Sequence, residues 1–163
     1  MTDEFYMRRA IELAKKGRGW TNPNPMVGAV IVKNGSIIGE GYHEKCGELH
    51  AERNAIASLT ESAEGATLYV TLEPCPMCAG AIVQARIPRV VIGCMNPKAG
   101  CAGSVLDMLH EDGFNHQAEV ETGVLGEECS RMMKDFFKEL REEGKRKKAE
   151  KTEEIKEDSH AGN

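Results

Sequence analysis

The chain lacks long hydrophobic runs: no apolar stretch approaches the roughly 18 residues that a membrane-spanning helix needs. The opening Met1-Thr2-Asp3-Glu4 also lacks the basic charge and apolar core of a signal peptide, and no internal repeat is visible. With 163 residues, 40% hydrophobic and 29% charged, the composition is typical of one soluble domain. We therefore expect a cytoplasmic protein with no membrane segment.

An excess of positive charge is missing too. The net charge is −5 and the pI is near 5.6, which argues against a surface that coats nucleic acid, where a pI above about 9 is usual. The charge is uneven, however, because residues 131–151 hold nine basic against five acidic residues. Lys138 and Arg141 could thus belong to a basic binding face, but composition favours the alternative of a solvated helix with i,i+4 charge pairs.

Six cysteines in a chain of this length suit a reducing compartment better than a disulfide framework. Four of them have no partner spacing and can be small buried hydrophobes: Cys46, Cys94, Cys101 and Cys129. Cys46 lies four residues before a histidine and is an alternative ligand. Three other histidines are expected on the surface or in loops: His110, His116 and His160.

The remaining cysteines form Pro74-Cys75-Pro76-Met77-Cys78, which follows His50-Ala51-Glu52. Alone, Cys75-x-x-Cys78 could be a redox pair or half of a structural zinc site. Together with His50 it makes a His/Cys/Cys set, which leaves the fourth tetrahedral position of Zn²⁺ open, as catalytic zinc sites do. Glu52 is then free to move protons as a general base and acid. The spacing therefore predicts hydrolytic metal chemistry.

Hydrophobic periodicity and turn signals predict an α/β order in which both metal half-sites begin helices. The i,i+3 spacing puts both cysteines on one helix face, beside a helix N-terminus that favours thiolates. Asn34-Gly35 predicts a hairpin, and the helix before the last strand lets the last two strands run parallel. The expected helices are 2–16, 50–60, 77–86, 105–110 and 125–141, and the expected strands are 26–33, 36–42, 66–71, 89–94 and 119–122.

The pair His50-Ala51-Glu52 and Pro74-Cys75-x-x-Cys78 resembles the cytidine-deaminase-like superfamily, over about residues 3–141. The resemblance implies a three-layer α/β/α sandwich with a five-stranded mixed sheet, a zinc cofactor and a homodimer. It also implies that Glu52 is catalytic and that His50, Cys75 and Cys78 bind Zn²⁺. Residues 1–141 would form the deaminase domain, and the Lys/Glu-rich residues 142–163 a frayed helix extension or a disordered tail.

Two branches of that superfamily resemble different parts of the chain. Residues 67–141 look like bacterial tRNA adenosine deaminases through Thr71-Leu72-Glu73-Pro74-Cys75-Pro76-Met77-Cys78-Ala79-Gly80-Ala81, Gly100-Cys101-Ala102-Gly103-Ser104, Phe114-Asn115-His116 and Asp135-Phe136-Phe137. Residues 6–52 look like the pyrimidine deaminase of riboflavin biosynthesis through Asn22-Pro23-Asn24-Pro25-Met26-Val27-Gly28 and Gly41-Tyr42-His43-Glu44-Lys45. The resemblance implies four substrate contacts: Asn24, Val27, His43 and Ala51.

The chain departs from each branch. The tRNA enzymes carry a base-contacting asparagine where this chain has His43, whereas the riboflavin enzyme typically has histidine there. Many tRNA enzymes also carry aspartate where this chain has Asn96. The riboflavin enzyme, however, has a longer segment between its cysteines and usually a fused reductase domain. The first expectation is deamination of the wobble adenosine in a tRNA anticodon loop, bound partly by Lys138 and Arg141. The alternatives are the riboflavin pyrimidine, a free base or nucleoside such as cytosine or guanine, and a zinc-stabilised binding module without turnover, which would have no need of Glu52.

Overall fold

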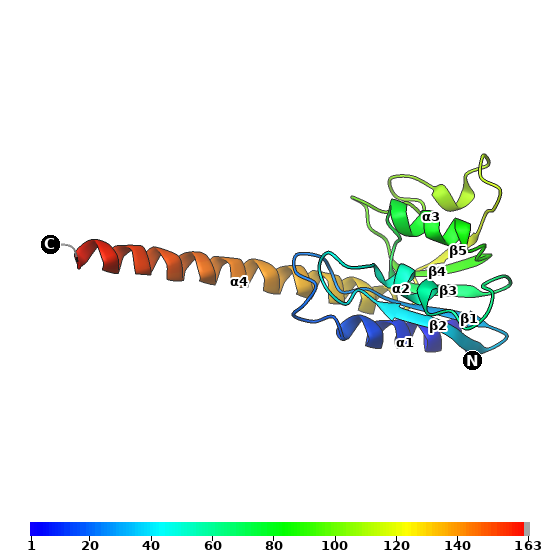
Figure 1. Ribbon diagram of the computed structural model, residues 1–163, viewed down its shortest axis with the longest axis horizontal. Helices are drawn as coiled ribbons and strands as arrows, with labels where there is room; N and C mark the ends of the chain where they lie inside the picture. Colours follow the sequence, from blue (N-terminus) through cyan, green and yellow to red (C-terminus); the bar gives the residue numbers. More distant parts are fainter. Residues whose placement is uncertain (162–163) are drawn as a thin grey trace.

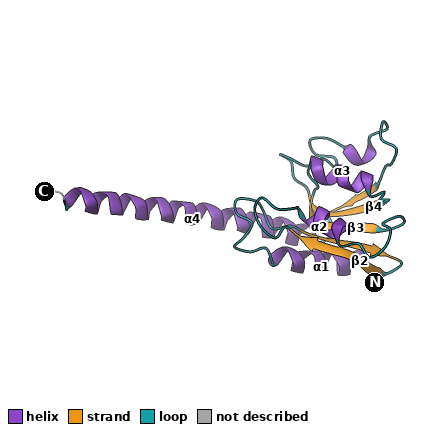
Figure 2. Ribbon diagram, viewed as in Figure 1, coloured by secondary structure: helices purple, strands orange, loops and turns teal. Residues whose placement is uncertain are grey.

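A computed structural model of the chain describes residues 1–161 and has the expected α/β/α architecture, with helices on both faces of one sheet (Figures 1 and 2). Its elements are α1 Asp3–Lys15, β1 Gly28–Lys33, β2 Ser36–Tyr42, α2 Ala51–Ala57, β3 Thr67–Leu72, α3 Pro76–Gln84, β4 Arg89–Cys94, the 3-10 helix η1 Met108–His110, β5 Glu119–Thr122 and α4 Gly126–His160.

The five strands form one mixed sheet in the order β2-β1-β3-β4-β5. β1 is antiparallel to β2 and β3, while β3, β4 and β5 run parallel. Asn34 and Gly35 both have positive φ at the β1–β2 turn, the backbone that tight hairpins require. The predicted hairpin, the parallel last pair and the five-stranded mixed sheet are confirmed.

Alternate residues of each strand face the two helical layers. In β1, Ala29 and Ile31 join the core under α2 and α3, whereas Val30 and Val32 pack with α1 and the start of α4. This period-two burial explains why the strand reads as a continuous apolar run, since both of its faces are covered. In Figure 1, α1 lies on one side of the sheet and α2 and α3 lie on the other.

The two motifs sit at helix starts. His50 is the N-cap of α2 and Cys75 the N-cap of α3, both with extended backbone, and Pro76 is the first residue of α3. A proline is well suited to that position because its fixed φ fits the helix and its missing N–H would have no helical partner. The prediction that both metal half-sites begin helices is confirmed.

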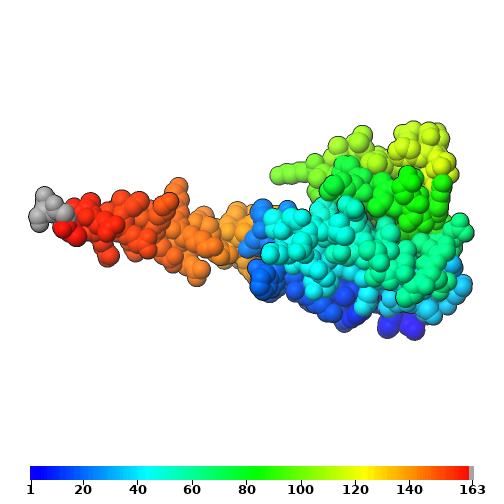
Figure 3. Space-filling view, viewed as in Figure 1, coloured from blue at the N-terminus to red at the C-terminus, as the bar shows by residue number. Residues whose placement is uncertain are grey.

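α4 is much longer than the expected 125–141 and extends from the body as an arm (Figure 3). From residue 144 to 161 every residue is exposed. Ion pairs one turn apart, Lys147 with Glu143 and Arg146 with Glu150, stabilise this part of the helix. The domain boundary at residue 141 stays a prediction, and residues 162–163 of the expected tail lie outside the described part.

The expected helix over residues 105–110 is wrong, because only Met108–His110 form a 3-10 turn. Val105 N–H donates to the carbonyl of Gly100 at 2.9 Å, so the chain folds back on the preceding loop at this point. Between residues 1 and 161, no helix combines the length and the hydropathy that crossing a membrane would take.

Candidate metal centre and active site

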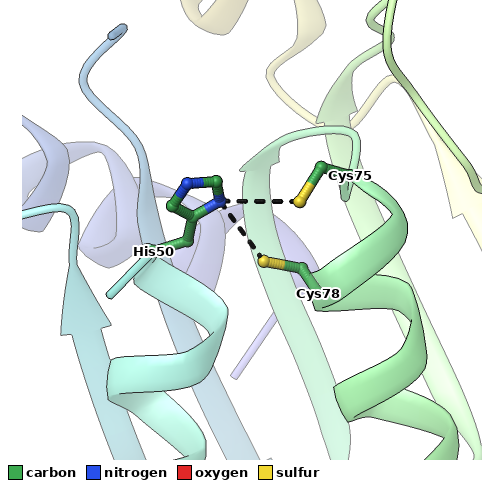
Figure 4. Close-up of side chains that lie close together, drawn as sticks. All are labelled: His50, Cys75 and Cys78. Carbon is green, nitrogen blue, oxygen red and sulfur yellow. Dashed lines mark hydrogen bonds between the residues drawn. The ribbon is translucent and has the colours of Figure 1, made fainter. Parts of the chain in front are cut away.

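Three side chains from two helix starts converge on one point (Figure 4). His50 Nδ1 lies 3.5 Å from Cys75 Sγ and 3.5 Å from Cys78 Sγ, and within residues 1–161 this is the one His/Cys/Asp/Glu group found with metal-ligand geometry. Ligands at ordinary Zn–N and Zn–S lengths on tetrahedral corners are about 3.5–3.6 Å apart for an N–S pair. The donor set and its spacing therefore fit Zn²⁺, and Cys46 is not a member of the group.

The Cys75 and Cys78 thiols are coupled by a hydrogen bond between them. A hydrogen bond from Cys78 lowers the pKa of Cys75 to about 5, although burial opposes this shift. The same bond raises the pKa of Cys78, because Cys78 donates its proton. This direction favours the thiolate of Cys75, which is the form that binds a metal ion.

Glu52 lies in the first turn of α2, two residues after the ligand His50, and its side chain is only 3% exposed. It is outside the metal-ligand group. Burial raises the pKa of its carboxyl. A buried carboxyl with a raised pKa holds a proton more readily than an exposed one, which suits a residue that acts as both general base and general acid.

A cavity of about 180 Å³ opens over the metal ligands. Its walls are formed by two ligands, Glu52, the last residue of β3 and residues of four loops: Asn24, Pro25, Val27, His43, His50, Glu52, Leu72, Glu73, Cys75, Asn96 and Ala99. This volume is below the roughly 300–1,000 Å³ of pockets that enclose drug-sized ligands. It suits a single nucleobase, with the rest of a nucleotide outside.

Three of the four expected substrate contacts line this cavity: Asn24, Val27 and His43. His43 is 3% exposed, and its Nδ1 lies 3.1 Å from the carbonyl oxygen of Leu49. A carbonyl only accepts, so Nδ1 carries the hydrogen, and Nε2 can accept from Asn24 Nδ2 at 3.4 Å. Ala51 is instead fully buried in the core under α2 and is not among the lining residues.

A second, wider groove of about 600 Å³ adjoins the cavity and shares Pro25, Leu72 and Asn96 with it. Lys98, Lys134 and Arg141 line it together with apolar side chains such as Phe137. Arg141 was an expected contact and faces this groove, whereas Lys138 is exposed on α4 outside the groove lining. Sequence reasoning missed Lys98 and Lys134, although residues 130, 134, 137 and 141 have the spacing of one helix face.

Sequence reasoning also missed Glu73, which is buried at 3% exposure next to the Pro74-Cys75 pair. Burial would raise the pKa of this carboxyl, but hydrogen bonds from Ser104 Oγ and from the backbone N–H groups of Asn96, Ser104 and Ala102 outweigh burial and lower it. Glu73 is therefore a buried carboxylate held by neutral donors.

Comparison with known proteins agrees with this geometry. Residues 1–94 match the family model described as the cytidine and deoxycytidylate deaminase zinc-binding region. The tRNA-specific adenosine deaminase of Bacillus subtilis is 49% identical over 156 residues, covering 90% of this chain and 94% of the relative. The riboflavin biosynthesis protein RibD of Actinobacillus pleuropneumoniae is 51% identical over 143 residues, but this chain spans only 37% of its length.

Among solved structures, RibD of Acinetobacter baumannii superposes with a TM-score of 0.73 at 42% identity, covering 83% of this chain and 39% of that one. The relatives thus divide between two deaminase branches while agreeing on the family. The N–S distances in the His/Cys/Cys group agree with the match to a zinc-binding deaminase family. The chain belongs to the cytidine and deoxycytidylate deaminase family and is a zinc-dependent deaminase whose zinc ligands are His50, Cys75 and Cys78.

Proposed function

We propose that the chain converts the wobble adenosine of tRNA to inosine. The observation that carries this proposal is the continuity of the small cavity with a cation-lined groove. An enzyme that acts on a base of an RNA must take that base out of the stack into a closed pocket, while the flanking backbone stays outside. A cavity for one base beside a groove with three cations meets both needs.

The reaction would use Glu52 twice. Zinc held by the three ligands lowers the pKa of water and so supplies a nucleophile at neutral pH. Glu52 takes a proton from the attacking water and gives it to N1 of adenine as the new C–O bond forms at C6. It would then take the proton of the new C6 hydroxyl and deliver it to the amino nitrogen while the C6–N bond breaks. Ammonia leaves and the ring carbon becomes a carbonyl, so one carboxylate serves as base and then as acid.

The groove would hold the phosphates next to the target nucleotide. Lys98 comes from the loop after β4, and Lys134 and Arg141 lie about two and four turns into α4, on the same face. Contacts of such side chains to phosphate release counterions, which makes binding salt-dependent. Lys138 stays a predicted contact, and it would touch the RNA only if the RNA followed the exposed side of α4.

Two further features favour the tRNA adenosine deaminase branch over the riboflavin branch. Only Pro76 and Met77 separate the cysteines, as in the motif that resembles tRNA adenosine deaminases. The Bacillus subtilis tRNA-specific adenosine deaminase also aligns over 94% of its length. Dimerisation, which the resemblance implies, stays a prediction for sedimentation analysis.

The second candidate is the diaminohydroxyphosphoribosylaminopyrimidine of riboflavin biosynthesis, and His43 favours it. A buried imidazole that faces Asn24 at the cavity wall replaces the asparagine of the tRNA branch. If this pyrimidine is the substrate, His43→Asn should abolish its turnover, whereas adenosine deamination should survive that change or improve.

The test is to incubate the purified zinc-loaded protein with three substrate classes and to measure ammonia. The classes are a tRNA with adenosine at the wobble position, the riboflavin pyrimidine, and a panel of free bases and nucleosides including cytosine and guanine. We expect ammonia from the tRNA alone. Ammonia from the pyrimidine alone, with loss of activity in His43→Asn, would refute the proposal in favour of the second candidate.

A further inference from the structure

Every hydrogen-bond acceptor position of the Glu73 carboxylate is used to bind one loop, residues 96–104. One oxygen accepts from the N–H groups of Ala102 at 3.1 Å and Ser104 at 2.9 Å. The other accepts from Asn96 N–H at 2.8 Å and from Ser104 Oγ. A carboxylate offers about four acceptor positions, so these four donors from residues 96–104 fill it.

These donors require a carboxylate rather than an amide. In a glutamine, the NH₂ group would have to face either Asn96 N–H or the pair Ala102 N–H and Ser104 N–H. Ser104 Oγ can turn and accept, but a backbone N–H cannot. A Glu73→Gln substitution therefore leaves at least one buried donor opposed by another donor.

The loop also closes tightly around this carboxylate. A Cβ added at Gly100 would overlap the Glu73 carboxyl group, so only glycine lets the backbone approach this closely. Cys101 N–H donates to the carbonyl of Pro74 at 2.8 Å, which ties the loop to the residue before the ligand Cys75.

The same loop forms part of the catalytic cavity. Asn96 and Ala99 line the cavity together with His50 and Glu52. Those two residues are held by α2, whereas Asn96 and Ala99 belong to no helix or strand. Their position therefore depends on the contacts that fix the loop, and the Glu73 carboxylate is the centre of those contacts.

We propose that Glu73 is a positioning residue that fixes the 96–104 loop as a wall of the catalytic cavity and thereby sets the affinity for substrate. Its carboxylate acts through the loop because its acceptor positions are filled by loop donors. Opening the wall should weaken binding of the ground state and of the transition state equally, which raises KM and leaves kcat nearly unchanged.

The first test needs no substrate. Backbone amide exchange should be about ten-fold or more faster in Glu73→Gln than in wild type, either at residue 96 or at residues 102 and 104, because the N–H groups that face the new NH₂ lose their acceptor. Zinc content should stay stoichiometric. The matched control is Glu64→Gln, an exposed glutamate on the loop after α2, which should change nothing. Unchanged exchange in the 96–104 loop of Glu73→Gln would overturn the proposal.

The kinetic test rests on the proposed function, so wobble-adenosine tRNA is the probe. For Glu73→Gln we expect KM to rise about five- to ten-fold with kcat within about two-fold of wild type. A fall in kcat accompanied by loss of zinc would overturn the proposal, because Glu73 would then support the ligands rather than the wall. If wild type ignores this tRNA, the proposed function fails, while the exchange result still decides the role of Glu73.

Gly100→Ala provides an independent approach should Glu73→Gln fold poorly. By itself it should open the loop and raise exchange as Glu73→Gln does, because the methyl group displaces the carboxylate. In a Glu73→Ala background the methyl group has room, so Gly100→Ala should add less than about two-fold to the exchange rate. Additive effects of the two changes would contradict the direct contact on which the proposal depends.

Discussion

Glu52→Gln separates proton transfer from metal binding more cleanly than any other single change in the cavity. Glutamine has nearly the volume of glutamate, and the position is buried with 3% exposure, so packing is preserved. Glu52 is outside the His50, Cys75 and Cys78 group, so zinc content should remain at one per chain. Only the ability to accept and donate protons is lost.

The expected loss of rate follows from the number of steps that Glu52 serves. A positioned general acid or base contributes typically about 10²- to 10⁴-fold. Because one carboxylate would act both as base on water and as acid on the leaving nitrogen, we expect kcat to fall by at least about 10⁴-fold, or roughly 5 kcal/mol in the barrier.

The assay is single-turnover ammonia release, with zinc measured by atomic absorption in the same samples and Glu64→Gln as the surface control. A Glu52→Gln protein that keeps its zinc and half of the wild-type rate would refute the mechanism. Loss of zinc in that variant would place Glu52 among the ligands and contradict the geometry.

Three further changes test other parts of the account. Cys78→Ala should lower both zinc occupancy and Tm, because a lost ligand removes metal-linked folding energy; unchanged zinc content by atomic absorption would mean that another residue ligates. Lys134→Ala with Arg141→Ala should weaken tRNA binding and reduce the slope of log K against log salt by about 0.7 per lost contact, measured by filter binding; an unchanged slope would exclude the groove as the phosphate site. Asp3→Asn should lower the free energy of unfolding by about 1 kcal/mol at pH 7. Hydrogen bonds from Arg89 and then from Tyr69 lower the pKa of Asp3, whose side chain is one-third exposed. Because the folded pKa of Asp3 lies below its unfolded value near 3.8, its contribution to stability is complete above that value and is lost as pH falls through the folded value. The free energies of unfolding of the two proteins, measured by urea titration, should therefore converge as the pH is lowered below 3.8.

The metal centre could be predicted from sequence because it depends on local spacing. His50 and Cys75 each stand immediately before a helix, and Cys78 follows one turn later, so three ligand positions are set by two helix starts. The β1–β2 hairpin was accessible for the same reason, since the Asn34-Gly35 turn is a short-range signal, whereas the strand order became known only from the structure.

The cation-lined groove and the hydrogen bonds between Glu73 and the 96–104 loop could not be predicted in this way. Lys98 meets Arg141 only after β4, β5 and α4 have packed, and Glu73 binds donors that lie 23 to 31 residues later in the chain. The sequence left open whether the chain beyond residue 141 extends the helix or is disordered, because an exposed, charged helix has no apolar stripe to mark it; Ile155 is the one large exposed apolar side chain beyond residue 141 in the described part.

The most direct test of the proposed activity is nucleoside mass spectrometry of a tRNA transcript with adenosine at the wobble position after incubation with the zinc-loaded protein. The account predicts one inosine per tRNA at that position, none in a transcript with guanosine there, and none with Glu52→Gln. A wobble adenosine left intact by protein that deaminates a small pyrimidine in the same buffer would contradict it.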